Sequence, residues 1–393
     1  MLIRKSLPYA LAQFCVIAFQ WAAMIFIPLY FRQQGVSAAR IGALVAIFDF
    51  STLLLVFPLG VLSDRIPPRP LMIAGGALAA AAGMALPWRT TLPWMALCMA
   101  VAGAAFTLSS IALAALFFKQ VGEERRGAEV AVFNAGGVLG GGVGAWLCGQ
   151  LMQRFPVAHV LFPAAAGFAL GWALIALLLP PAQGLSFPLI EYGRDLKRGA
   201  TWVLIAIMVV TASHSGFEHS GYTLLQTEVI HMSAAMIGNL FIIIAVWMAL
   251  ISVWAGRRHD RAERPLLMIG LGLLISGAFM AASASAHGPL DFLAYRILHT
   301  TGDAVYMLLI MVLAAQIFPK HRVGGAYAFA LTINTASYAC FALVGGLVGQ
   351  RYGFARAFHL SGAIEFLGGI ALLALRPRLR RSFRIEEAPG ERS

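Results

Sequence analysis

The segment VSAARIGALVAIF at residues 36–48 returns in the second half of the chain as MSAAMIGNLFIII at residues 232–244. The two copies share a serine, two alanines, an isoleucine and a glycine, each separated by 196 positions. Further matched pairs are Gly60 and Gly256, Asp64 and Asp260, Arg65 and Arg261 and, at an offset of 200, Gln150 and Gln350 and His159 and His359. Because the match persists with little drift, we infer an internal duplication, and hence two equivalent halves.

The composition indicates that both halves lie in a membrane. Of the 393 residues, 60% are hydrophobic and 12% are charged, whereas a soluble domain has about half and a quarter. The first apolar run, from Leu7 to Tyr30, is longer than a signal-peptide core and is read as a membrane span. All four cysteines lie in apolar runs, which favours small core residues over disulfides or metal ligands.

Each span needs roughly 20 apolar residues, so the chain length allows about twelve, and we predict an all-α membrane protein of two pseudo-symmetric six-helix bundles. The predicted spans are 7–30, 38–62, 70–88, 92–118, 128–153, 157–179, 200–226, 233–255, 265–286, 289–318, 324–350 and 355–375. The predicted parts are an N-terminal bundle (1–179), a cytoplasmic linker (180–199), a C-terminal bundle (200–376) and a basic cytoplasmic tail (377–393).

The net charge is +12, and the distribution of the basic residues indicates the topology. With both termini inside, most of the Lys and Arg fall in inside segments, as expected of a protein inserted with its basic loops in the cytoplasm. The basic excess therefore needs no nucleic acid to explain it. We expect a monomer with both termini cytoplasmic, in a bacterial inner membrane.

The loop GVLSDRIPPR at residues 60–69 resembles the signature loop of the major facilitator superfamily. Gly60, Asp64, Arg65 and Arg69 match that pattern, and a degraded second copy carries Asp260 and Arg261. The resemblance implies a twelve-helix secondary transporter whose signature loops act as a conformational latch between the halves. A carboxylate at a helix end, near a basic turn, has the charge for such a contact.

The segment NAGGVLGGGVGAWLCG at residues 134–149 is rich in glycine but lacks the ending of a phosphate-binding loop. Gly136, Gly140 and Gly144 recur every four residues and share one helix face, which allows close helix packing. We predict that this face packs against the other half, and that Gly345 and Gly349 repeat the arrangement.

Ionisable groups inside the spans are few, and such groups usually face a polar interior. Helical spacing sorts them into stripes. Three stripes result: His214, Glu218 and Tyr222; Arg296, His299, Asp303 and Tyr306; and Gln13 with Gln20, beside Trp21. The family plan lines the central cavity with spans 1, 4, 7 and 10, and the stripes fall on three of these. Span 4 carries only neutral Thr107, Ser109 and Ser110.

Several groups have more than one interpretation. Arg296 and Asp303 form either a structural ion pair or a substrate site. Asp49 neutralises a cavity arginine, serves as a second proton site or bonds a neighbouring hydroxyl. Glu365 lies in a peripheral span, which favours a structural role, and His219 points away from Glu218, towards a helix–helix contact.

These residues indicate a secondary active transporter for a small, possibly anionic, organic solute that works by alternating access and proton coupling. Arg296 offers a fixed positive site for an anion, with His299, Gln13, Gln20, Trp21 and Tyr222 shaping the site. Glu218, Asp303, His214 and Asp49 are the expected proton-coupling groups, because burial disfavours the charged form of carboxyl and imidazole groups alike. The substrate and Asp303 would compete for Arg296.

The alternatives are drug or metabolite efflux by proton antiport, a non-transporting sensor or assembly factor of the same fold, and a metal or metal-chelate transporter. His214 and His219 point about 140° apart on a helix and no second ligand cluster is evident, so no metal site is expected. No nucleophile–base pair or cofactor loop is evident either, so we expect neither an enzyme nor a cofactor.

Overall fold

A computed structural model describes residues 3–120, 126–180, 197–262, 264–317 and 323–384. The first half contains α1 (Ile3–Gln33), α2 (Ala38–Arg65), α3 (Pro68–Ala85), the 3-10 turn η1 (Leu86–Trp88), α4 (Leu92–Gln120), α5 (Arg126–Leu151) and α6 (Val157–Leu178). The second contains α8 (Gly199–Leu224), the π-helical turn η2 (Leu225–Val229), α9 (Ala234–Ala262), α10 (Pro265–Ser283), α11 (Pro289–Ile317), α12 (Val323–Tyr352) and α13 (Phe354–Arg384).

Twelve helices of the described chain are long and apolar enough to cross a membrane, which confirms the predicted spans. Helices satisfy their own backbone hydrogen bonds, which lipid cannot do. The last helix continues through Pro377 to Arg384, so the boundary predicted at residue 376 falls inside a helix. Most of the predicted linker, residues 181–196, lies outside the described residues.

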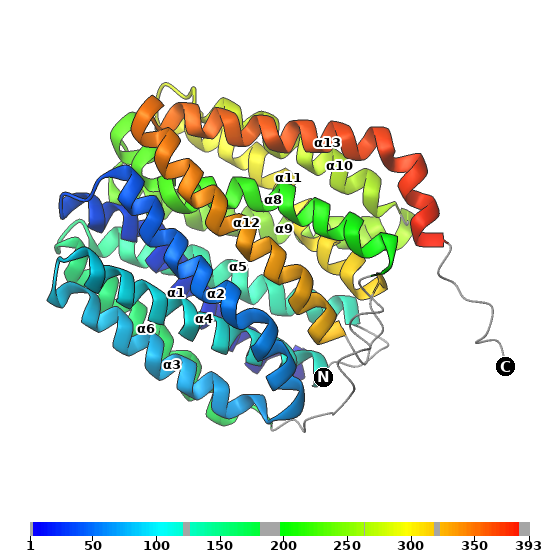
Figure 1. Cartoon of the computed structure of the whole chain (residues 1–393), viewed down its shortest axis with the longest axis horizontal. Helices are drawn as coiled ribbons and strands as arrows, with labels where there is room; N and C mark the ends of the chain where they lie inside the picture. The colour runs from blue at the N-terminus through cyan, green and yellow to red at the C-terminus, as the bar shows by residue number, and fades with distance from the viewer. Residues whose placement is uncertain (1–2, 121–125, 181–196, 263, 318–322, 385–393) are drawn as a thin grey trace.

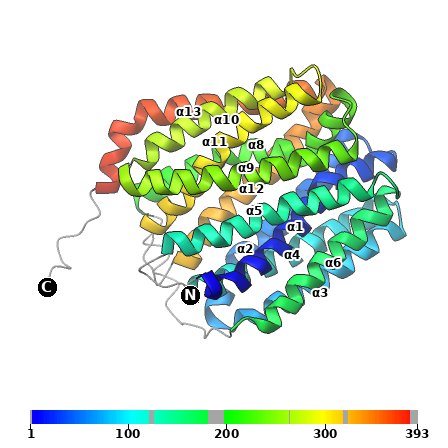
Figure 2. The ribbon, with the colours of Figure 1, turned by 180° about the vertical axis from the view of Figure 1, so that it is seen from behind.

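The two halves lie side by side and meet along two pairs of helices. Helix α2 runs beside α12 in Figure 1, and α5 runs beside α9 when the molecule is seen from behind in Figure 2. The start of α1 and the end of α13 lie at the same end of the molecule. This end is called the terminal end below, and the opposite one the distal end.

Glycine lets the backbones of these helices approach closely. A Cβ on Gly42 of α2 would lie 2.8 Å from the carbonyl oxygen of Ala342 in α12. At its counterpart in the repeat, Gly238 of α9, a Cβ would lie 2.9 Å from the carbonyl oxygen of Ala145 in α5. The repeat in sequence is therefore a repeat in the interface.

The predicted partner of the Gly136, Gly140 and Gly144 face is wrong. This face packs on α1 of its own half, where added Cβ atoms would collide with the backbone of Ala10, Phe14 and Ala18. The other half contacts α5 through its neighbouring face, at Gly142 and Gly149. A residue every four positions identifies a face, but it does not identify what covers that face.

Apolar packing and polar contacts both join the halves at the distal end. One core cluster mixes residues of both halves there, whereas two others lie within single halves. Arg32 of α1 and Glu228 of η2 form an ion pair at 2.8 Å, and Gln150 of α5 donates to Asn239 of α9 at 2.8 Å. Gly35 (φ +75°) and His231 (φ +59°) make the equivalent left-handed turns nearby.

Candidate functional site

A cluster of charged and polar side chains lies buried within the second half. We call it the C-half cluster. Its members come from four helices: His214, Glu218 and Tyr222 from α8; Ser276 from α10; Arg296, His299, Asp303 and Tyr306 from α11; and Glu365 from α13. The predicted stripes of α8 and α11 therefore face one another. Glu218 is the ionisable member with the most exposed side chain, at 19%.

Arg296 is held by an acidic group and an aromatic face. Its Nη2 lies 2.5 Å from Glu218 Oε1, and its guanidinium carbon lies 4.5 Å from the centre of the Tyr222 ring. Both contacts come from one face of α8, because Glu218 and Tyr222 are four residues apart. Only 3% of Arg296 is exposed, so the ion pair is shielded from water and its partners are strongly interdependent.

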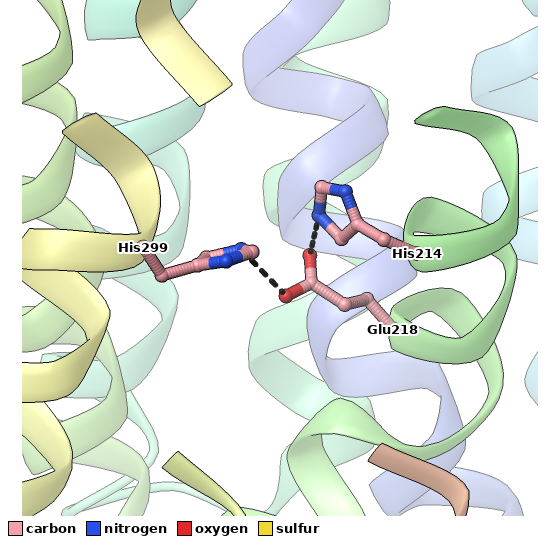
Figure 3. Close-up of side chains that lie close together, drawn as sticks. All are labelled: His214, Glu218 and His299. Atoms are coloured by element: carbon pink, nitrogen blue, oxygen red, sulfur yellow. Dashed lines mark ion pairs between the residues drawn. The ribbon is translucent and has the colours of Figure 1, made fainter. Parts of the chain in front are cut away.

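Two histidines and two carboxylates alternate around a ring. His214 Nε2 lies 3.2 Å from Glu218 Oε2 and 3.7 Å from Asp303 Oδ2. His299 Nε2 lies 3.1 Å from Asp303 Oδ2 and 3.8 Å from Glu218 Oε1. Figure 3 shows His214 and Glu218, both from α8, and His299 from α11 pointing towards one another.

A second layer supports this ring from α10, α11 and α13. Ser276 Oγ lies 2.6 Å from Asp303 Oδ1 and 2.8 Å from Glu365 Oε2. His214 Nδ1 lies 3.0 Å from the Tyr306 hydroxyl and 3.4 Å from Glu365 Oε1. The outer nitrogens and oxygens of the ring are thus held in place by neighbouring groups.

The sequence paired Arg296 with the wrong carboxylate. Asp303 lies two helix turns beyond Arg296 on α11 and contacts His299, while Glu218 reaches Arg296 from the facing helix. Helical spacing reports which residues share a stripe, but contacts between helices depend on their relative rotation and depth.

Sequence reasoning missed Ser276 and placed Glu365 outside the central group. Glu365 is completely buried and contacts His214 and Ser276, although its helix was taken as peripheral. Its signal was its chemistry, since an ionisable group inside a span faces the protein interior by default. Ser276 carries no such signal, because serine is common in transmembrane helices.

The α1 residues lie apart from the cluster. Gln13, Gln20 and Trp21 are half-buried, and among the described residues none of them makes a hydrogen bond or ion pair with a cluster member. Trp21 is connected indirectly, through ring contacts at 5.7 Å to Phe241 and from there at 5.5 Å to Tyr222. An aromatic path thus joins α1 to the face that covers Arg296.

Asp49 and His219 face each other across the two halves, away from Arg296. His219 Nδ1 lies 3.7 Å from Asp49 Oδ2, and the His219 ring lies 5.8 Å from that of Tyr338 on α12. Asp49 is 3% exposed. His219 therefore makes the helix–helix contact that its position predicted, with Asp49 as the partner.

The signature-loop residues are described only in part. Gly60 is buried at the end of α2, and the Arg69 guanidinium donates to the carbonyl oxygen of Leu177 on α6. Asp64, Arg65, Asp260 and Arg261 belong to α2 and α9, but their side chains lie outside the described residues. The latch stays a prediction.

Twelve spans in two equivalent bundles, with an ionisable cluster buried in one of them, define a polytopic membrane transporter. The chain belongs to the Major Facilitator Superfamily, whose family model matches residues 9–219 and 195–392. This membership points to a transporter of small molecules across a lipid bilayer and away from an enzyme.

Two relatives share 26% identity with the chain over 269 residues. Both are called uncharacterized MFS-type transporters, from two strains of Mycobacterium tuberculosis, and the match covers 62% of this chain and 62% of each relative. Among solved structures, the chain is similar to the human organic anion transporter MFSD10 (TETRAN), with a TM-score of 0.72 over 94% of this chain and 99% of that one. At 14% identity, that likeness shows the fold alone.

Proposed function

We propose that this protein is a secondary active transporter that moves a small organic anion together with protons by alternating access. The observation that carries the proposal is the buried ion pair between Arg296 and Glu218. An arginine held by the protein's own carboxylate is a binding site for an anion, because a substrate carboxylate presents the same oxygens to the same guanidinium.

The exchange of one carboxylate for another accounts for proton coupling. When the substrate takes the guanidinium, Glu218 loses its counter-charge in a poorly hydrated site. A buried, unpaired carboxylate is costly and takes up a proton. The bound anion and the bound proton then neutralise each other's charge, so both cross together.

The other residues of the ring surround the carboxylate that takes up this proton. His214, 3.2 Å from Glu218, is placed to pass a proton to it, and His299 and Asp303 extend the path within the same half. Tyr222 covers Arg296 on its other side and, with Trp21 and the glutamines Gln13 and Gln20 on α1, forms the aromatic and polar surroundings of the substrate. The human structural neighbour is an organic anion transporter, which agrees with this class of substrate.

The remaining parts follow the same proposal. Asp49, facing His219 between the halves, acts as a second protonatable group that responds when the halves separate. The signature residues Gly60, Asp64, Arg65, Arg69, Asp260 and Arg261 latch the cytoplasmic side when the site faces outward. We place the protein as a monomer in a bacterial inner membrane, with the terminal end in the cytoplasm.

Proteoliposomes with a pH-sensitive dye inside test this proposal. A panel of mono- and dicarboxylates, organic phosphates and neutral analogues is added outside. We expect selected anions to acidify the lumen, and Glu218→Gln to abolish acidification. Glu228→Gln is the matched control, since Glu228 pairs with Arg32 at the exposed distal end. Equal acidification by wild type and Glu218→Gln, or a response to the neutral analogues alone, contradicts the proposal.

A further inference from the structure

The ring of the C-half cluster has the donor atoms of a transition-metal site. We infer that His214, His299 and Glu218 bind a divalent cation of the Zn²⁺ type, with Asp303 beside the site. This inference goes beyond the proposed transport activity. A metal on Glu218 takes the place of the proton that the transport proposal puts on that carboxylate, so metal and proton are alternative occupants of the site.

The spacing of the donors fits such an ion. A tetrahedral site with metal–ligand distances of about 2.0–2.2 Å places neighbouring donors about 3.3–3.5 Å apart. In the group of His214, His299 and Glu218, His214 Nε2 lies 3.2 Å from Glu218 Oε2 and His299 Nε2 lies 3.8 Å from Glu218 Oε1. Two compact groups suited to a metal ion share His214: one adds Glu218 and His299, the other Asp303 and Glu365. No metal site was expected from His214 and His219, which diverge on their helix; His299, on α11, takes the place of His219 in the group.

The orientation of the imidazoles is the second observation. His299 Nδ1 lies 2.9 Å from the backbone carbonyl of Ser276, and a carbonyl only accepts, so Nδ1 carries the hydrogen. In a neutral imidazole, Nε2 then presents a lone pair towards Asp303 and Glu218. His299 Nε2 is fully buried and has no hydrogen-bond partner among the described residues. A proton on Nε2 or a metal ion between these atoms offsets the repulsion between this lone pair and the carboxylate oxygens.

Outer groups of this kind are usual around metal-bound histidines, whose second nitrogen contacts a carbonyl or carboxylate. Ser276 supplies the carbonyl for His299, and Glu365 supplies a carboxylate 3.4 Å from His214 Nδ1. Asp303 is fixed through its other oxygen by Ser276. Both histidines thus direct Nε2 into the ring.

The charge balance favours a divalent ion. Three carboxylates (Glu218, Asp303 and Glu365) face one guanidinium (Arg296) in a buried site, and the two remaining negative charges are balanced by a proton on each histidine or by one divalent ion. Arg296 occupies Glu218 Oε1 and leaves Oε2 for the metal. Imidazole and carboxylate donors together suit Zn²⁺, Co²⁺ or Mn²⁺, whereas Ca²⁺ and Mg²⁺ prefer oxygen alone.

Metal binding is measured on purified full-length protein in detergent after treatment with a chelator. Zn²⁺ is titrated by calorimetry and Co²⁺ by its visible absorption. We expect one metal per chain, proton release on binding at low pH, and at least a tenfold weaker affinity in His299→Gln and Asp303→Asn. Glu365→Gln weakens binding by about 10–100-fold through His214. No transport is needed for these readouts.

His359→Ala is the matched control, because His359 is exposed on α13 and contacts Ser285; it retains wild-type affinity. Size-exclusion profiles and the thermal midpoint without metal confirm that each variant is folded. Absence of Zn²⁺ binding by folded wild type, or an affinity that His299→Gln and Asp303→Asn leave unchanged, overturns the inference and assigns the ring to protons alone.

Discussion

The two halves share one fold but differ in the chemistry of equivalent positions. At the offsets of the repeat, the members of the C-half cluster correspond to small or neutral residues: His214 to Ala18, Glu218 to Ala22, Arg296 to Ala100, His299 to Gly103, Asp303 to Thr107 and Glu365 to Ala165. Ala18 and Ala22 are fully buried. The first half uses these positions for close packing, while the second uses them for charge.

The difference teaches how a duplicated fold divides its work. Thr107 donates to the carbonyl of Gly103 in its own helix at 2.8 Å, so the polar side chain of α4 is satisfied locally. A Cβ on Gly103 would collide with the backbone of Phe48 on α2. We infer that the first half acts as a packed body against which the second half, carrying the exchangeable charges, moves.

Breaking the charged half has the largest expected effect. Arg296→Met lowers transport at least a hundredfold and strands Glu218, which costs about 3–5 kcal/mol of stability. The double variant Arg296→Met with Glu218→Gln recovers most of that stability but no transport. Ala100→Ser, at the equivalent position of the first half, transports normally. Thermal unfolding and uptake assays on all three variants check this, and a double variant as unstable as Arg296→Met argues against the pairing.

Moving a charge into the packed half sharpens the comparison. Ala22→Glu places a carboxylate where the structure provides no cation, and we expect a loss of about 2.5 kcal/mol or more in stability. Ala22→Gln has nearly the same size and isolates the charge from the overpacking. The difference in thermal midpoint between the two variants is the measurement. If Ala22→Glu is as stable as Ala22→Gln, the first half tolerates charge and the contrast fails.

The smallest effect is expected at an exposed contact between the two halves. Arg32 and Glu228 occupy equivalent positions and pair at the distal end with side chains 43% and 36% exposed. Exposed pairs contribute about 0–1 kcal/mol, so Arg32→Gln shifts the thermal midpoint only slightly. A shift in the thermal midpoint as large as that of Arg296→Met would mean that the exposed Arg32–Glu228 pair stabilises the protein as much as the buried pair does, which contradicts the comparison.

Hydropathy and the repeat predicted the fold almost completely, since the length of each span and the offset of the repeat can be read directly from the sequence. Helical spacing also placed Glu218 and Arg296 on facing stripes. Helical spacing did not predict the contacts between helices. Arg296 pairs with Glu218 rather than with Asp303, Gly140 packs on α1 rather than on the other half, and Glu365 lies beside His214. Each failure concerns how one helix is rotated against another, which packing of the whole bundle decides.

In the proposed cycle an anion replaces Glu218 on Arg296, and Glu218 then takes up a proton. The most direct measurement is proton uptake during binding, followed with an indicator dye in weakly buffered detergent solution as an organic carboxylate selected by thermal shift is added. We expect wild type to take up one proton per anion bound. We expect Glu218→Gln to bind the anion without taking up a proton. Binding without proton uptake by wild type, or the same uptake by Glu218→Gln, would contradict it.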